Sequence, residues 1–132
     1  MINKAKRFQG LVANPGTNKT KDLIVRKGQG VFVSMHVSKQ GGSNNITQVA
    51  LYVDGQNVVA LTFAAAHNLG INRANNSGMV LCEGTINTLT VQYNEPLYFE
   101  KELRISISTG SDAGVVQIVA SAVVGASCSY PL

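Results

Sequence analysis

The sequence predicts an all-β protein, a small β-sandwich or jelly roll of about eight antiparallel strands. Short segments of alternating apolar and polar residues recur roughly every 8–12 residues, and turn-forming Gly, Asn and Asp residues separate them. Residues 64–70 instead have a helical composition, and we expect them to form a single turn that ends at Gly70. The length of 132 residues allows for one hydrophobic core of useful size.

The middle of the chain contains the clearest strand and the clearest hairpin. From Val31 to Val37 every second residue is apolar, which predicts a half-buried strand with these residues on one face. The dipeptide Asp54-Gly55 separates the strands expected at residues 49–53 and 56–63. This pair favours a type I′ turn, because both central residues of such a turn need a positive φ angle. The Asp54 side chain is assigned to this turn.

Three further strands are expected toward the C-terminus. The first covers residues 85–99 and is interrupted at Pro96, which marks a bend or an edge because it has no N–H to donate. The other two cover residues 103–108 and 115–124, with the even-numbered residues of the last strand, from Val116 onward, on one face. The turn at residues 109–114 between them predicts a second hairpin that closes the domain.

Positive charge is concentrated at the start of the chain. Up to Lys27 there are seven Lys and Arg residues against one Asp, whereas the remainder has four Lys and Arg residues against six Asp and Glu. Residues 1–21 show little apolar periodicity. We therefore divide the chain into a basic extended arm, residues 1–22, and a β-sandwich or jelly-roll domain, residues 23–132.

The basic arm and the residues just after it are the predicted partner-binding site. Its charges favour an anionic partner, either nucleic acid phosphates or an acidic protein surface, unless the arm is merely a solubilising tail. A protein surface is preferred, since apolar residues are interleaved with the charges and no run of aromatic residues is present to stack on bases. The residues assigned to this site are Lys4, Lys6, Arg7, Phe8, Leu11, Val12, Lys19, Lys21, Arg26 and Lys27.

No motif in the sequence indicates catalysis, a metal or a cofactor. Neither His36 nor His67 has a Cys, Asp or Glu at metal-ligand spacing, and no nucleophile or phosphate-binding motif is present. The carboxylates of Glu95, Glu100 and Glu102 lie among basic residues, which favours local ion pairs over a glycosidase-like pair. We expect a protein that is not an enzyme and has no cofactor.

The composition favours an assembled protein. Only 14% of the residues are charged, which is low for a small monomer, so we expect a homo-oligomer, either a dimer or a trimer. Asparagines gather in two predicted loops, residues 41–46 and 68–78, where they serve either as turn residues or as a partner-binding or glycan-binding rim. Apolar runs are too short for a membrane helix, the N-terminus does not resemble a signal peptide, and Cys82 and Cys128 are expected as free thiols.

Residues 23–124 resemble, by strand pattern, the jelly-roll type of capsid decoration (cement) proteins of tailed bacteriophages. The resemblance is carried by the segment Leu51-Tyr52-Val53-Asp54-Gly55 and by the apolar run at residues 119–124. It implies a structural virion protein that is made in the host cytoplasm, lies on the capsid surface and bridges neighbouring subunits of the major capsid protein lattice. Two alternatives remain: a glycan-binding spike or fibre head, or a small nucleocapsid-type protein that binds nucleic acid through its basic arm.

Overall fold

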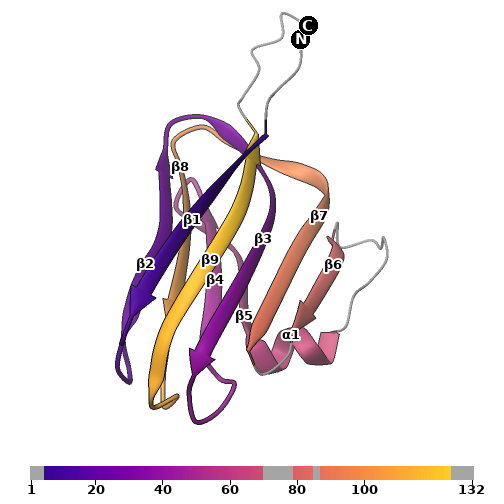
Figure 1. The fold of residues 1–132 in the computed structure, drawn as a ribbon. Helices are drawn as coiled ribbons and strands as arrows, with labels where there is room; N and C mark the ends of the chain where they lie inside the picture. The colour runs from indigo at the N-terminus through magenta and orange to yellow at the C-terminus, as the bar shows by residue number, and fades with distance from the viewer. Residues whose placement is uncertain (1–4, 70–78, 85–86, 126–132) are drawn as a thin grey trace, which may run out of the picture.

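The computed structural model describes residues 5–69, 79–84 and 87–125, and these form two antiparallel sheets packed face to face (Figure 1). Sheet A has five strands in the order β1-β9-β3-β7-β6, and sheet B has four in the order β2-β8-β4-β5. The strands are β1 (Ala5–Ala13), β2 (Thr20–Lys27), β3 (Gly30–Gly41), β4 (Gln48–Val53), β5 (Gln56–Thr62), β6 (Met79–Gly84), β7 (Thr88–Phe99), β8 (Glu102–Ser108) and β9 (Val115–Gly125). The predicted β-sandwich is confirmed.

A single apolar core fills the space between the sheets. Every second residue of β8 and β9 is buried, since successive side chains of a strand point to opposite faces. The largest fully buried side chains come from both sheets and from the helix: Phe32, Met35, Leu51, Phe63, Leu89, Phe99, Leu103, Ile105, Ile107 and Ile118. Their burial against one another is the main driving force for the fold.

The inward face of β3 changes phase at a bulge. The pairing of β3 with β7 and with β9 shifts between Phe32 and Ser34, so that Phe32 and then Met35 and Val37 point into the core. The prediction that Val31 and Val33 share a face with Met35 is wrong, because an extra residue at a bulge reverses the alternation. A similar shift near Gly41 leaves Val116 exposed rather than inward.

The predicted hairpin at Asp54-Gly55 is confirmed. Asp54 and Gly55 have φ angles of 51° and 83°, the two positive values that a type I′ turn requires. The prediction that the Asp54 side chain serves this turn alone is incomplete. Its carboxylate accepts hydrogen bonds from the backbone N–H groups of Glu100, Lys101 and Glu102, which lower its pKa. The turn is thereby joined to the loop that precedes β8.

The predicted second hairpin is wrong, because β8 belongs to sheet B and β9 to sheet A. Residues 109–114 therefore cross from one sheet to the other. Residues 42–47 make a similar crossing between β3 of sheet A and β4 of sheet B. Short loops between two packed sheets have to satisfy their own backbone polar groups, so both crossings need side-chain partners.

A buried ion pair supplies those partners. The Lys39 ammonium lies 2.5 Å from Oδ2 of Asp112, and the two side chains are 1% and 0% exposed. Asp112 also accepts a hydrogen bond from the Thr47 hydroxyl and from the backbone N–H groups of Ser43 and Asn44. Burial raises the pKa of Asp112, but the hydrogen bonds from Lys39, Thr47 and Asn44 outweigh it and hold the pKa below its ordinary value. One carboxylate thus ties the two sheet-crossing loops together.

The expected extended arm is instead part of the sandwich. Residues 5–13 form β1, which pairs with β9 along its whole length, and residues 20–27 form β2, which pairs with β8. A boundary at residue 22 falls inside β2. The inward residues Phe8 and Val12 pack against the core, and the basic residues Lys6 and Arg7 before them hid this partial burial from the sequence pattern. Residues 1–4 of the expected arm lie outside the described residues.

Gly10 allows β1 to pass close to β2. A Cβ atom at this position would lie 1.7 Å from the carbonyl oxygen of Leu23. Leu23 sits at a shift in the pairing of β2 with β8, between Asp22 and Ile24. The edges of the two sheets therefore meet where β1 has no side chain, at Gly10, and β2 has an extra residue, at Leu23.

The predicted helical turn is confirmed as α1 (Phe63–Leu69), which begins with the buried Phe63. Its expected end at Gly70, like most of the second asparagine loop, lies outside the described residues. At Pro96 the pairing of β7 with β3 skips from Leu97 to Gln92, in agreement with a bend there. In the described residues, no helix is long and apolar enough to cross a membrane.

We expect Gly10→Ala to lower the free energy of unfolding by about 1–3 kcal/mol or more, since β1 and β2 must separate to admit the methyl group. Chemical denaturation measures this change. Gln9→Ala is the matched control, because Gln9 is exposed on the same strand. Equal stability of the two variants would contradict the close approach of β1 to β2.

Acid should reduce the contribution of the Lys39–Asp112 ion pair to the free energy of unfolding. The folded-state pKa of Asp112 lies below its ordinary value of 3.8, so the stabilisation is complete above about pH 4 and is lost as the pH falls through the folded-state pKa. At pH 7, Asp112→Asn should cost about 3–5 kcal/mol, because Lys39 keeps its charge without a counterion. The difference from wild type in urea unfolding should shrink at lower pH.

Asp22→Asn is the control for this experiment. Asp22 forms an exposed ion pair with Arg104, so its loss should cost less than about 1 kcal/mol. A difference between wild type and Asp112→Asn that stays constant from pH 7 to pH 3 would contradict the role given to the buried carboxylate.

Candidate functional site

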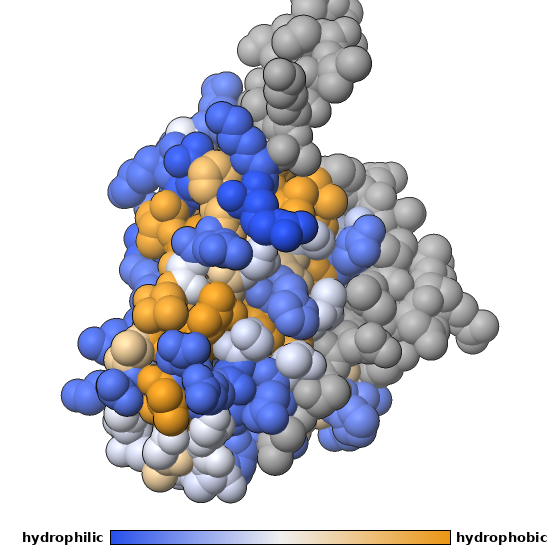
Figure 2. Space-filling model, viewed as in Figure 1, coloured by the Kyte–Doolittle hydropathy of each residue, from blue (hydrophilic) through white to orange (hydrophobic). Residues whose placement is uncertain are grey.

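The outward-facing side chains of sheet A form a broad surface that no other described element covers. The strand register aligns them in four rows across β1, β9, β3 and β7. We call this surface the outer face of sheet A, and its rows are Arg7-Val123-Ser34-Gln92, Gln9-Ser121-His36-Thr90, Leu11-Val119-Ser38-Thr88 and Ala13-Gln117-Gln40. Figure 2, in which β1, β9 and β3 face the viewer, shows apolar and polar patches mixed over this side.

Charge is sparse in these four rows, although Glu83 of β6, the fifth strand of sheet A, is paired with Thr90 and extends the second row. Of the residues in the four rows, Arg7 is the one charged side chain when histidine is neutral, and most of the others are Ser, Thr, Gln or aliphatic. Leu11 is 57% exposed and lies beside Val119. Depletion of charge with scattered apolar groups is typical of protein–protein interfaces, and it is unusual for a surface that only faces water.

A shallow hollow of about 390 Å³ lies in the middle of the outer face of sheet A. Its lining comes mainly from the first two rows, and it includes His36, whose Nδ1 is 2.7 Å from the Thr90 hydroxyl. His36 thus points outward, as the sequence predicts. Besides His36, the lining contains Ser, Thr, Gln and Arg side chains but no Phe, Tyr or Trp ring. The hollow offers hydrogen-bonding groups without the large aromatic platform on which a sugar ring or a base commonly stacks.

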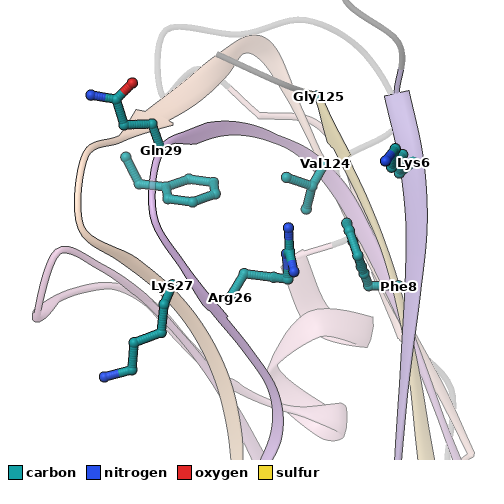
Figure 3. A pocket seen from close by; sticks show the side chains of 8 residues that line it. Lys6, Phe8, Arg26, Lys27, Gln29, Val124 and Gly125 are labelled. Atoms are coloured by element: carbon teal, nitrogen blue, oxygen red, sulfur yellow. The ribbon is translucent and has the colours of Figure 1, made fainter.

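A second feature is a basic pocket at the end of the sandwich where β1 begins and β2 ends (Figure 3). We call it the basic pocket; its volume is about 120 Å³, and it is lined by Lys6, Phe8, Arg26, Lys27, Gln29, Phe99, Val124 and Gly125. The Arg26 guanidinium lies 4.2 Å from the centre of the Phe8 ring, a cation–π contact between the two strands. Gly30 admits the Phe99 ring beside it, since a Cβ there would lie 2.6 Å from that ring.

A chain of ion pairs runs from the basic pocket along the surface of sheet B. Lys27 lies 3.1 Å from Glu102, Glu102 lies 3.0 Å from Arg104, and Arg104 pairs in turn with Asp22. Hydrogen bonds from Arg104 and then Lys27 lower the pKa of Glu102, and the same network raises the pKa of Arg104. The local ion pairs expected around the acidic cluster are therefore present at Glu102. The side chain of Glu95 lies outside the described residues.

The structure divides the predicted partner-binding residues among four places. Lys6, Phe8, Arg26 and Lys27 meet in the basic pocket, and Arg7 and Leu11 lie on the outer face of sheet A. Val12 packs against the core, while Lys19 and Lys21 lie at the opposite end of the sandwich, near Thr109. Lys4 is outside the described residues. The positive charges therefore do not form one continuous surface. Because β1 and β2 run in opposite directions, the start of β1 and the end of β2 lie at one end of the sandwich, and the start of β2 lies at the other.

Sequence reasoning missed the outer face of sheet A as a candidate site. Its residues come from four segments that are far apart in the sequence, and each segment contributes only a few Ser, Thr or Gln residues. The signal that was available is the polar half of the alternating pattern, such as Ser34, His36 and Ser38. These outward residues carry no charge, which is uncommon for the exposed side of a strand.

Comparison with known proteins assigns no family. No protein-family model matches the chain, and no curated protein matches it. Among solved structures, the chain is similar to FLHE, with a TM-score of 0.45 and 8% identity over 90% of this chain and 96% of that one. It is also similar to a chain in the structure of the infectious bursal disease virus Gx strain, with a TM-score of 0.43 and 15% identity. Latent PorU from Porphyromonas gingivalis gives a TM-score of 0.40 and 12% identity.

The coverage of these neighbours differs. The match spans 98% of this chain but 33% of the bursal disease virus chain, and 96% of this chain but 13% of PorU. At these TM-scores the similarities carry no argument about function, which has to come from the surface of the molecule.

Deletion of residues 1–21 should unfold the domain rather than remove an appendage, because it takes away β1 and the start of β2. Loss of cooperative thermal unfolding and of dispersed amide signals in NMR spectra would show this. The double substitution Lys19→Gln/Lys21→Gln is the control, since it removes two arm charges at exposed positions and should leave the fold intact. A truncated protein that still unfolds cooperatively would contradict the place of β1 in sheet A.

Proposed function

We propose that this chain is a structural protein of a virus particle, and more narrowly a capsid decoration protein that bridges neighbouring subunits of a major capsid protein lattice. The observation that carries the proposal is the nearly uncharged outer face of sheet A, a surface formed by four paired strands. Such a surface suits a permanent protein contact better than a freely dissolved monomer.

The rigidity of this surface supports the proposal. Both neighbours of β3 and both neighbours of β9 are hydrogen-bonded strands, so the rows of the outer face keep their spacing without a partner. Little conformational entropy is then lost on docking, and a pre-organised face can hold two subunits at a set distance. A cement protein has to resist displacement of the subunits that it joins, and a stiff β-sandwich meets this requirement.

The described residues include no group of three or more His, Cys, Asp or Glu residues that could hold a metal ion. Their strongest electrostatic cluster, Lys39 with Asp112, is buried and serves the fold. We propose that the protein is not an enzyme, that it acts on the capsid surface, and that it is a homo-oligomer in which copies meet through the same low-charge strands.

The two alternative functions have less support. A glycan-binding head would use large aromatic platforms, and the hollow in the outer face of sheet A has no Phe, Tyr or Trp in its lining. A nucleocapsid-type protein would use a continuous basic surface, whereas the cations of β1 and β2 are divided between opposite ends of the sandwich.

The proposal is tested by the copy number of this chain in purified virus particles. Quantitative mass spectrometry should find a fixed ratio to the major capsid protein. Reassembly onto stripped particles should then be weakened about tenfold or more by Gln9→Glu/Gln92→Glu, because each substitution places an unpaired charge on the outer face of sheet A. Both glutamines are exposed in the free protein, so the fold should be unaffected.

The matched control is Gln48→Glu/Gln56→Glu, which adds the same charges to exposed positions of sheet B. This variant should bind like wild type. Absence of the chain from purified particles would refute the proposed virion role. Equal binding of the two double variants would refute the use of the outer face of sheet A while leaving a virion role open to another surface.

A further inference from the structure

We propose that the basic pocket is a binding site for a carboxylate group of an acidic protein segment. The site is formed by two strands of different sheets, β1 with Lys6 and Phe8, and β2 with Arg26 and Lys27. It is separate from the outer face of sheet A, and its test does not depend on the proposed virion role.

Two of the three cations in the basic pocket have no anionic partner. The side chain of Lys27 pairs with Glu102, but within the described residues the side chains of Lys6 and Arg26 form no ion pair or hydrogen bond. Three positive charges around one small hollow repel one another, and Glu102 compensates only one of them. An external anion would remove this unfavourable interaction, so the pocket should attract one.

The basic pocket has room for a small anionic group. A volume of about 120 Å³ accommodates a carboxylate or a single phosphate. Val124, Gly125 and the buried ring of Phe99 supply the apolar part of the lining, and the cations Lys6, Arg26 and Lys27 are exposed beside it.

Arg26 is held in a position suited to a carboxylate. Its guanidinium rests on the face of Phe8, at 4.2 Å from the ring centre, which restricts the side chain before any ligand binds. Within the described residues no hydrogen bond uses the N–H groups of this guanidinium, so they are available to donate to a ligand. A carboxylate accepts two such parallel hydrogen bonds, the strongest geometry that arginine offers.

The surroundings favour an acidic protein segment over nucleic acid. The aromatic rings are not available to stack on bases, since Arg26 covers one face of Phe8 and Phe99 is 2% exposed. One carboxylate also lies beside the pocket, because Glu102 contacts Lys27. A polyanion that extends past Lys27 would meet this negative charge, whereas a single glutamate or aspartate side chain would not.

The test is a titration of the full chain with the peptide acetyl-Glu-Glu-Glu-Glu-amide, followed by NMR. We expect saturable shifts of the amide signals of Lys27, Gln29 and Gly125, and no such shifts with acetyl-Gln-Gln-Gln-Gln-amide. Arg26→Gln should weaken binding about tenfold, and Lys6→Gln should weaken it by a smaller factor. Arg26→Lys, which keeps the charge but loses the forked donor, should fall between wild type and Arg26→Gln.

The matched control is Lys19→Gln/Lys21→Gln, which lowers the net charge at the far end of the sandwich. Binding within twofold of wild type supports a defined pocket, whereas a loss equal to that of Arg26→Gln would reduce the effect to net charge and overturn the proposal. If Arg26→Gln does not fold, the affinity of Lys6→Gln for the glutamate peptide is the deciding measurement, because the Lys6 side chain makes no contact that the fold requires. Tighter binding of octathymidylate than of the glutamate peptide at the same signals would assign the pocket to nucleic acid instead.

Discussion

The arrangement of the sandwich depends on one buried carboxylate, that of Asp112. Its partners come from the end of β3 and from the loop between β3 and β4, while Asp112 itself lies in the loop between β8 and β9. Both loops lead from one sheet to the other. A buried charge is unfavourable unless it is paired and fully hydrogen-bonded, and this one is satisfied only when the two crossings lie side by side. The pair Lys39–Asp112 therefore gives the two sheets a defined relative position at this end.

At the opposite end the sheets are joined by different contacts. Arg26 of β2 stacks on Phe8 of β1, and the loop before β8 is capped by the carboxylate of Asp54. These groups are exposed or half-buried, so their contribution to stability is smaller and screened by salt. The sandwich thus has a buried, tightly bonded end and an open, charged end. Binding sites are commonly found at the second kind of end, where side chains are accessible and not all of their hydrogen bonds are used.

The surface chemistry of the protein follows from the same separation. Charges are gathered at the ends and along β2 and β8, which leaves Arg7 as the one charged residue in the four rows of the outer face of sheet A. A low charged fraction, 14% in this sequence, does not say where the uncharged surface lies. Pairing of β1, β9, β3 and β7 brings uncharged residues from four segments onto one face. The low charge of the whole sequence is therefore concentrated on one surface, which is the candidate interface.

Local patterns in the sequence were sufficient for the fold class, the type I′ hairpin at Asp54-Gly55 and the short helix, because alternation, turn geometry and helix composition depend on neighbouring residues. The same patterns named four of the eight residues that line the basic pocket, Lys6, Phe8, Arg26 and Lys27, but placed them on an extended arm or just after it. Strand pairing is a long-range property, so the place of β1 beside β9, the crossing between β8 and β9 and the burial of Lys39 with Asp112 depended on contacts between distant segments. A lysine and an aspartate separated by 73 residues carry no local sign that they will meet, and their pairing emerges only when both sheets are formed.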